Sequence, residues 1–410
     1  MRTYLLLSLS LLGLTLACRE DEQSPTEPDA SPAVATTAST LVFAQVSAGS
    51  VHTCGVTSDN RLFCWGDNSG GQLGDGTMTN RFAPVPVSGA LRFRQVSAGY
   101  RSTCAVTTDN RAYCWGDNER GQLGDGTLDP HLTPTAVTGG RLFRTVEINW
   151  DDTCGVTASG DRAFCWGDNG AGQLGIGNNT GPEVLVTSDG SRFPLSTKPV
   201  AVAGGLTFRH VSPGFGHACG VTTDNRVFCW GSNRYGQVGD GTAGWFRFKP
   251  KLIAGNRQYR QVDAGADWTC AVTTGNRAFC WGQGQFGVLG NGTQSSSRYP
   301  KPVSGGLSFQ RVSAGSGFHT CGETTTNRAY CWGSNGIGQL GDGTRTDRLS
   351  PVAVVGGLSF SQVSAGATHS CGHTPQGRAY CWGANLGGQL GTGSTNIVIS
   401  PKPVPVAGPM

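Results

Sequence analysis

The feature that most constrains this chain is a tripeptide, Cys-Trp-Gly, that occurs seven times. A second Cys lies ten residues before each copy, or eleven in the third copy. Copies follow one another at 50 or 51 residues, except that the step from Cys154 to Cys219 is 65 residues. A fixed period of this size is typical of repeat proteins in which each unit packs only against its neighbours. The fourteen repeat cysteines are Cys54, Cys64, Cys104, Cys114, Cys154, Cys165, Cys219, Cys229, Cys270, Cys280, Cys321, Cys331, Cys371 and Cys381.

Each unit contains four short segments with strand character. In one unit these are residues 84–87, 93–99, 103–107 and 111–116, separated by the turn-forming pairs Ser-Gly, Ala-Gly and Asp-Asn. The 64 Gly of the chain fit many short strands joined by tight turns, and no window has sustained helical periodicity. Four strands repeated seven times predict an all-β fold, a single seven-bladed β-propeller with four-stranded blades over residues 41–408.

The two ends of the repeat region differ in a way that predicts how the ring closes. The first unit begins at Phe43 without a preceding Pro-Val strand, whereas the last unit is followed by a spare one at residues 403–406. We therefore expect the C-terminal strand to join the first blade, which would also remove exposed sheet edges.

The paired cysteines predict disulfides within blades. Each pair flanks a hairpin whose turn lies near Asp-Asn-Arg, so Cys54 falls directly opposite Cys64. Opposed residues of antiparallel strands are close enough for a disulfide. Zinc sites usually have ligands two to four residues apart, and that spacing is missing, so we predict no metal site. None of the fourteen is left as a nucleophile.

The N-terminus predicts export. Residues 1–17 combine Arg2 with an apolar run at residues 5–16, which is too short to span a bilayer comfortably. The segment resembles a lipoprotein signal that makes Cys18 the lipidated residue, and plain secretion is the alternative. Residues 18–40 are rich in Pro, Ser, Thr and acidic residues, so we expect a disordered tether. The expected location is the cell envelope, as an outer-membrane lipoprotein, or the extracellular space, where disulfides persist.

Charge argues against nucleic acid as a partner. The formal net charge is +4 and only 14% of residues are charged. Nucleic-acid-binding proteins usually concentrate basic residues in a patch or stripe, which this sequence lacks.

The repeat also resembles a known family. Residues 46–49 (Val-Ser-Ala-Gly), 52–54 (His-Thr-Cys), 64–68 (Cys-Trp-Gly-Asp-Asn) and 71–77 (Gly-Gln-Leu-Gly-Asp-Gly-Thr) are similar to the repeat of the regulator-of-chromosome-condensation family. The resemblance implies seven blades. It implies guanine-nucleotide exchange and chromatin binding only for a nuclear protein, which an exported chain with disulfides is not. An exported bacterial branch, which includes a propeller-type β-lactamase inhibitor, implies a protein that works by binding.

Strand direction predicts where a binding site would lie. The Ala-Gly turn and the long Gly-rich loop of each unit must share one end of the blade, and this end varies between units toward aromatic and Arg residues, which are common at binding hot spots. The alternative is that these side chains pack on neighbouring loops. The candidate partner-binding residues are Tyr100, Arg101, Trp150, Asp151, Asp152, Phe215, Trp245, Phe246, Arg247, Trp268 and Phe318.

Other repeated residues fit structural roles. The Trp of each Cys-Trp-Gly occurs once per blade, so we expect all seven to pack between blades. Four His precede the first Cys of their units, and we expect each to bond its own turn, because matching places on separate blades are too far apart for one metal ion. These are His52, His217, His319 and His369.

The sequence therefore predicts an exported, membrane-tethered binding protein. We expect a protein or cell-surface ligand as partner, no nucleic acid, no cofactor, membrane contact only through the N-terminal lipid, a monomer, and no enzymatic activity. Two alternatives stay open. One is a polysaccharide lyase or hydrolase that uses Glu147, Asp151 and Asp152 of the divergent third unit, which also carries an insertion at residues 178–197. The other is a structural cell-surface protein.

Overall fold

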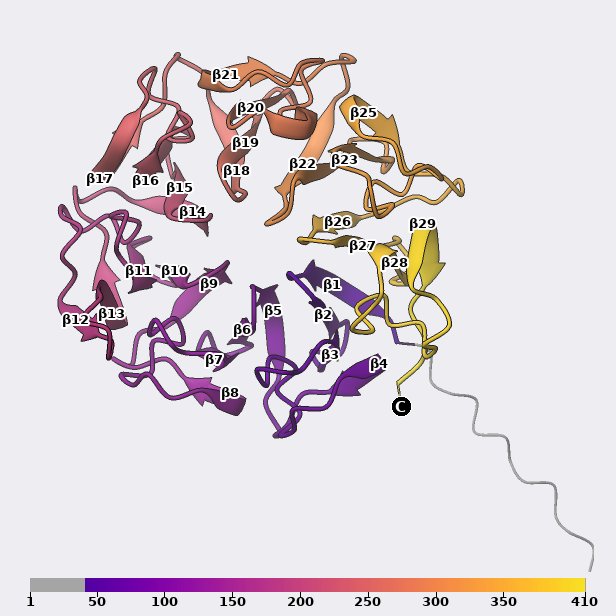
Figure 1. Ribbon diagram of the computed structural model, residues 1–410, viewed down its shortest axis with the longest axis horizontal. Coiled ribbons are helices and arrows are strands. Elements are labelled where there is room, and N and C mark those ends of the chain that lie inside the picture. The colour runs from indigo at the N-terminus through magenta and orange to yellow at the C-terminus, as the bar shows by residue number, and fades with distance from the viewer. Residues whose placement is uncertain (1–40, 410) are drawn as a thin grey trace, which may run out of the picture. The chain divides into compact units, whose positions relative to one another are not determined.

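The chain forms a ring of seven antiparallel sheets (Figure 1). The computed structural model describes residues 41–409, so the signal, the tether and Cys18 lie outside the described residues. The described part contains one short 3-10 helix, η1 (Gln285–Gly287), and none of its helices has the length and apolar character needed to cross a membrane. The predicted all-β, seven-bladed propeller is confirmed.

The first blade shows the plan of all seven. It consists of β1 (Phe43–Ala48), β2 (His52–Thr57), β3 (Leu62–Gly66) and β4 (Arg81–Pro86), hydrogen-bonded in that order from the ring axis outward. In β1 the side chains alternate between the core and the channel, and β2 is buried throughout because it has a strand on each side and a blade on each face.

The other blades repeat this order with one exception. Blade 2 contains β5 (Phe93–Ala98), β6 (Ser102–Thr107), β7 (Ala112–Gly116) and β8 (His131–Ala136). Blade 3 contains β9 (Phe143–Ile148), β10 (Asp152–Thr157), β11 (Ala163–Asp168), β12 (Glu183–Val186) and β13 (Arg192–Ala201). Blade 4 contains β14 (Phe208–Pro213), β15 (His217–Thr222), β16 (Val227–Asn233) and β17 (Gly244–Leu252). Blade 5 contains β18 (Tyr259–Ala264), β19 (Trp268–Thr273), β20 (Ala278–Gly282) and β21 (Ser297–Pro302). Blade 6 contains β22 (Phe309–Ala314), β23 (His319–Thr324), β24 (Ala329–Gly333) and β25 (Arg348–Ala353). Blade 7 contains β26 (Gln362–Ala365), β27 (His369–His373), β28 (Ala379–Ala384) and β29 (Ile399–Pro405).

Blade 3 has five strands rather than the predicted four. The insertion forms β12 and the start of β13, a hairpin in which Val184 faces Pro194, and β12 becomes the outer edge of the sheet. A signal for this hairpin was present in the sequence, because Asp189 and Gly190 form a typical hairpin turn between two apolar segments.

The prediction that the C-terminal strand joins the first blade is wrong. β29 pairs with β28 of its own blade, where Val404 faces Cys381, and β4 fills the same place in blade 1. The reason is that each long loop returns the chain to its own third strand, so each Pro-Val strand ends the preceding blade. The boundary expected from the sequence was shifted by one strand.

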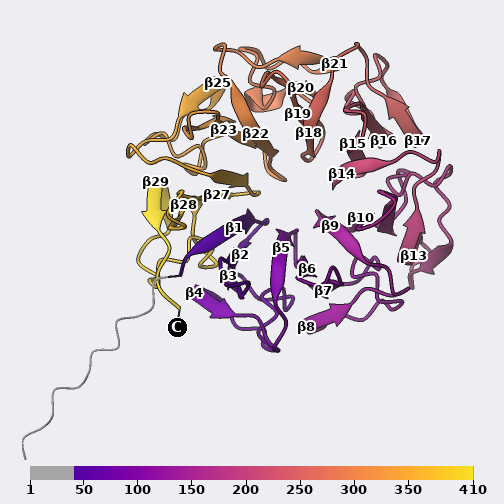
Figure 2. The same ribbon diagram turned by 180° about the vertical axis from the view of Figure 1, so that it is seen from behind.

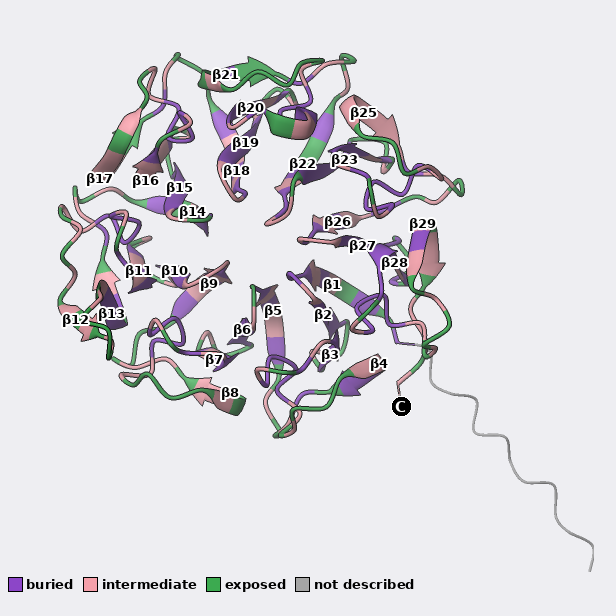
Figure 3. Cartoon of the chain, viewed as in Figure 1, coloured by how far each residue is buried: buried purple, intermediate pink, exposed green. Residues whose placement is uncertain are grey.

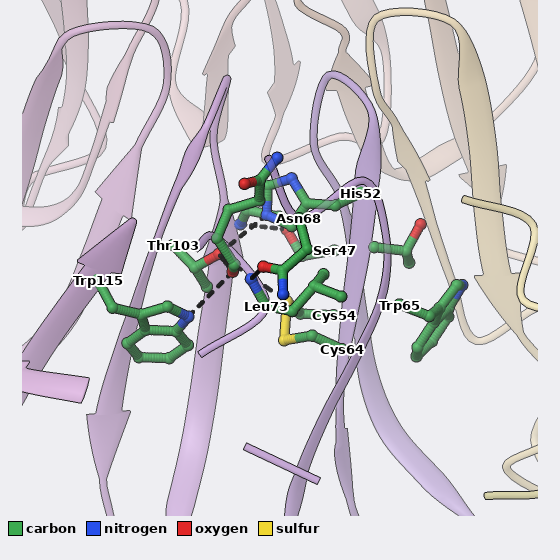
Figure 4. The surroundings of a disulfide bond; sticks show 12 residues. Ser47, His52, Cys54, Cys64, Trp65, Asn68, Leu73, Thr103 and Trp115 are labelled. Carbon is green, nitrogen blue, oxygen red and sulfur yellow. Dashed lines mark hydrogen bonds between the residues drawn. A yellow bond between two sulfur atoms is a disulfide. The ribbon is translucent and has the colours of Figure 1, made fainter. Parts of the chain in front are cut away.

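A tryptophan closes the ring instead. Trp65 is buried, and its Nε1 donates to the carbonyl oxygen of Gln389 at 3.0 Å, joining blade 1 to the long loop of blade 7. Trp115 makes the same bond to Gln72 at 3.0 Å (Figure 4). Both views place β1 beside β27 (Figures 1 and 2). The seven repeated Trp are core residues between blades, as predicted.

All seven predicted disulfides are present and lie within blades. Cys54 and Cys64 face each other across β2 and β3, with Cα atoms 4.1 Å apart. Pairs at the same register occur in the other six blades. Each disulfide therefore links the second and third strands of one blade, and the contacts that join blades are noncovalent.

The four histidines differ from the expectation that each bonds its own turn. His52 Nε2 lies 2.9 Å from Thr103 Oγ1 of the next blade, and that hydroxyl donates to the carbonyl of Gln72 at 2.8 Å (Figure 4). Since the hydroxyl hydrogen is used there, Nε2 is the donor to Thr103. Burial lowers the pKa of His52 to about 4, so the ring is neutral at pH 7.

Deleting residues 400–410 should destabilise the propeller even though β29 does not join blade 1. The deletion leaves β28 without its outer partner strand and removes Val404 and Val406, which pack on the cluster of Phe43 and Trp65 between the last and first blades. We expect a loss of about 3 kcal/mol or more in the free energy of unfolding, measured by denaturant titration. Deletion of residues 408–410 is the control, and equal stability of both truncations would contradict this account of blade 7.

Candidate functional site

One end of the propeller carries both sets of variable loops. His52 at the start of β2 faces Gly66 at the end of β3, which in turn faces Arg81 at the start of β4. The turn before β2 and the long loop after β3 therefore lie at the same end of the blade, as the strand directions predicted. We call this end the loop face. Exposed residues are concentrated in loops and outer strands, whereas the inner strands are mostly buried (Figure 3).

Three aromatic side chains from consecutive blades form a row on the loop face. Tyr100 of blade 2 stacks on Trp150 of blade 3 with ring centroids 4.4 Å apart, and Phe215 of blade 4 meets Trp150 edge-on at 5.1 Å. Tyr100 and Phe215 stay 38% and 48% exposed. The packing alternative therefore applies to these rings, which hold one another in place, while Tyr100 and Phe215 still present apolar surface to solvent and partner binding stays a prediction.

A second aromatic group lies at the start of β17, directly after the long loop of blade 4. Trp245 is 83% exposed, and Phe246 lies against it and against Phe248. Arg247 has a structural role, since its Nε is 2.8 Å from Oδ2 of Asp240 in the loop before β17. Arg81 and Arg348 make equivalent pairs in other blades.

The remaining candidates divide between the surface and the core. Trp268 is fully buried and its Nε1 donates to Thr320 Oγ1 at 3.1 Å, so it occupies the place that His has in other blades and is not a surface residue. Phe318 is exposed and stacks over Trp268. Arg101 is half-buried and donates to Ser69 Oγ at 3.0 Å.

An acidic cavity of about 300 Å³ opens beside the aromatic row. Asp151 and Asp152 of blade 3 line it together with Asp168 at the end of β11 and Asp267 of blade 5. The other lining residues are Trp150, Ala171, Gln173, Phe215, Gly216, Ser232, Arg234 and Tyr235. Sequence reasoning missed Asp168, Arg234 and Tyr235, because Asp168 is one copy of an Asp that recurs in the first three units and so looked structural.

Burial and mutual repulsion shift the carboxyl groups of this cavity. Burial, with Asp168 nearby, raises the pKa of Asp151 to about 6. Burial raises the pKa of Asp152 well above its usual range, with Asp168 and Asp151 adding to the effect. Burial also raises the pKa of Asp267 to about 6, against the opposing charge of Arg234. The surroundings of these carboxyl groups therefore disfavour their ionised form.

Asp152 is the most constrained of these groups. It is 1% exposed, and its Oδ2 has no hydrogen-bond partner among the described residues. Leaving a buried carboxylate oxygen without a partner is costly, and such groups are uncommon in native proteins.

The third-blade carboxylates do not share one cavity. Glu147 faces the central channel, a cavity of about 740 Å³, where it pairs with His210 at 2.5 Å. Asp151 and Asp152 line the loop-face cavity instead. Among the described residues no group of three His, Cys, Asp or Glu side chains is placed to hold a metal ion.

Asp152→Asn should stabilise the protein at high pH. Between the ordinary pKa near 3.8 and the raised value, the folded protein keeps a proton that the unfolded chain releases, so stability falls as pH rises through this window. The amide carries no such penalty. We expect the variant to melt about 2 °C or more above the wild type at pH 8 and to lose that advantage at pH 4. Asp224→Asn, at an exposed carboxyl, is the control and should give no gain at pH 8.

A stabilisation of Asp152→Asn that is equal at both pH values would show that Asp152 is not held protonated.

Comparison with protein families agrees with the repeat. One model of the regulator of chromosome condensation (RCC1) repeat matches residues 43–72, 93–122, 208–237, 259–288, 309–339 and 360–389. A second model of the same repeat matches residues 59–106, 109–149, 224–272, 276–321, 327–372 and 376–410. The segments of the first model fall in six blades and pass over blade 3, which carries Asp151 and Asp152.

Similar proteins share the propeller over part of their length. The probable E3 ubiquitin-protein ligase HERC4 of Homo sapiens is 30% identical over 201 residues, which is 47% of this chain and 18% of the ligase. The ultraviolet-B receptor UVR8 of Arabidopsis thaliana is 31% identical over 213 residues, or 51% of this chain and 46% of the receptor. The chain thus spans less than half the length of either relative.

Solved structures share the fold. Prp20p of Saccharomyces cerevisiae, studied for its binding to Gsp1p and histones, superposes with a TM-score of 0.71 at 19% identity, covering 90% of this chain and 87% of that one. Human WBSCR16 gives 0.69 at 20% identity, covering 79% and 84%. With the repeat models matching most of the seven blades, the chain belongs to the regulator of chromosome condensation (RCC1) repeat family, whose propellers are a protein-interaction scaffold.

Proposed function

We propose that this protein is an exported, membrane-tethered binding module that holds a partner protein on its loop face. The observation that carries the proposal is the aromatic row of Tyr100, Trp150 and Phe215, which spans three blades and keeps Tyr100 and Phe215 exposed. Rigid aromatic side chains give large contact area at low entropic cost, and they dominate the binding energy of many interfaces. Trp245 extends this surface along blade 4.

Export is supported by sequence and disulfides together. Residues 1–17 have the pattern of a signal, and seven disulfides suit an oxidising compartment. We therefore place the protein in the cell envelope or outside the cell, tethered through a lipid on Cys18, as a monomer that has no cofactor.

The three carboxylates that the sequence suggested for a sugar hydrolase, Glu147, Asp151 and Asp152, do not form one site. A glycosidase of the usual kind needs two carboxyl groups facing each other across the substrate. Glu147 is paired with His210 in the channel and is separated from the cavity that holds Asp151 and Asp152. The likeness to HERC4 covers 18% of that ligase, so we do not propose ligase activity for this chain.

The proposal predicts that partner recovery depends on the loop face. The propeller, residues 41–410, serves as bait for envelope and culture-fluid proteins of its host, which are identified by mass spectrometry. Because Phe215 and Trp245 are exposed, replacing both by Ala should leave the fold intact and lower recovery about tenfold or more.

The matched control replaces exposed apolar residues at the opposite end. Leu142 is 49% exposed and Leu252 is 45% exposed, and both lie beside the Asp-Asn-Arg turns rather than the loop face. Leu142→Ala with Leu252→Ala should leave recovery unchanged. Equal recovery by the two double variants would refute a binding site on the loop face.

A further inference from the structure

The seam between blades 3 and 4 breaks a hydrogen bond that recurs elsewhere in the ring. In four blades a buried His at the start of the second strand bonds a hydroxyl in the next blade, as His52 does with Thr103 at 2.9 Å. The others are His217 with Thr269, His319 with Ser370 and His369 with Thr53. At the seam between blades 3 and 4 both partners differ, because Asp152 replaces the His and Ala218 replaces the Thr.

The change leaves a buried carboxyl group where the repeat has a paired His. Ala218 has no hydroxyl to offer, so the Asp152 carboxylate has lost the bond that the repeat provides at this place. A side chain that only packed there would be apolar, whereas a buried carboxylate is stabilised by a donor that comes from elsewhere. The adjacent cavity is where such a donor can enter.

The cavity carries an excess of negative charge. Four aspartates line it, and Arg234 is the one cationic side chain among its lining residues. The negative charges of Asp117 and Glu119 in blade 2 also raise the pKa of Asp151, and the positive charge of Arg120 lowers it. The negative charges of Asp168 and Asp151 raise the pKa of Asp152. A bound cation would relieve this repulsion.

The aromatic lining indicates the kind of cation. Trp150, Phe215 and Tyr235 border the carboxylates, and aromatic faces attract organic cations. A planar guanidinium bonds a carboxylate through two N–H groups and stacks on an aromatic ring, which an ammonium does less well. At about 300 Å³ the cavity is at the lower limit for a ligand pocket, a size that suits one side chain.

We infer that this cavity receives the guanidinium of an arginine side chain of the partner protein, with Asp152 as its buried acceptor. The inference rests on the proposed function, since the arginine belongs to the protein bound on the loop face. Asp151 and Asp168 share the charge, and Trp150 and Phe215 of the aromatic row form one wall of the pocket.

Calorimetric titration at pH 8 of the propeller, residues 41–410, with N-acetyl-arginine amide tests the pocket. N-acetyl-citrulline amide has the same shape without the charge, so wild-type protein should bind the arginine probe and give no signal with citrulline. Asp152→Asn should weaken arginine binding about tenfold or more. Asp224→Asn, at the exposed carboxyl of an Asp-Asn-Arg turn, should have no effect.

Equal binding of the two probes, or unchanged arginine binding by Asp152→Asn, would overturn the inference.

Partner recovery then distinguishes this inference from the proposed function. If both hold, the arginine probe displaces the captured partner, citrulline does not, and Asp152→Asn recovers less partner. If recovery depends on Phe215 and Trp245 but not on Asp152, the inference fails and the loop-face proposal stands. If the arginine probe binds without displacing the partner, the pocket serves a free cation and the partner's arginine is refuted as its occupant.

Discussion

The structure depends on one hydrogen bond per blade, from the indole of the repeated tryptophan to the long loop of the preceding blade. The bond runs from Trp115 to Gln72 at 3.0 Å, and from Trp65 to Gln389 at 3.0 Å where the chain ends meet. A glycine makes the close approach of the loop feasible. A Cβ on Gly74 would lie 2.6 Å from Trp115 Nε1, and its φ of +69° is one that other residues rarely adopt. Each long loop of the loop face is held in this way by the next blade.

The disulfides and the tryptophans therefore have separate roles. Each disulfide links two strands within a blade, whereas the bonds between blades include the indole contacts, buried hydroxyls such as Thr103, and inner-strand side chains such as Gln45. The last seam uses the same contacts as the others, so the ring needs no exchanged strand. A closed ring of separately stapled blades presents variable loops while the core sequence stays nearly constant, and this is the sense in which the fold serves as a scaffold.

The repeat made most of the fold predictable. Cysteine spacing predicted the blade number and the disulfides, because a period of about 50 residues with opposed cysteines permits few other arrangements. The strand that ends each blade was misassigned, since residues 84–87 precede one unit and follow another equally well in the sequence. Trp268 was predicted to lie on the surface because it is a Trp in a variable turn, and its place in the repeat was not considered. It lies at the place of His52, and position in the repeat determines burial.

The acidic cavity was only half predictable. Asp151 and Asp152 were identified from the divergence of the third unit. Ala218, where the hydroxyl is lost, lies 66 residues after Asp152 in the sequence, and its effect on Asp152 becomes visible only in the structure, where their blades are adjacent. The same seam also differs at the channel. Pro213 has no backbone N–H to donate to a serine of the neighbouring blade. At this end of the seam Glu147 pairs with His210 instead. Both ends of this seam therefore depart from the repeat, and we place the function where the repeat is broken.

Repairing the seam tests that claim most directly. The double variant Asp152→His with Ala218→Thr restores the pair that His52 and Thr103 form, and it leaves the aromatic row unchanged. The measurement is recovery of the partner by this variant, with a melting curve to show that it is folded. We predict a folded propeller that no longer captures the partner. A repaired propeller that captures the partner as well as the wild type would contradict the account.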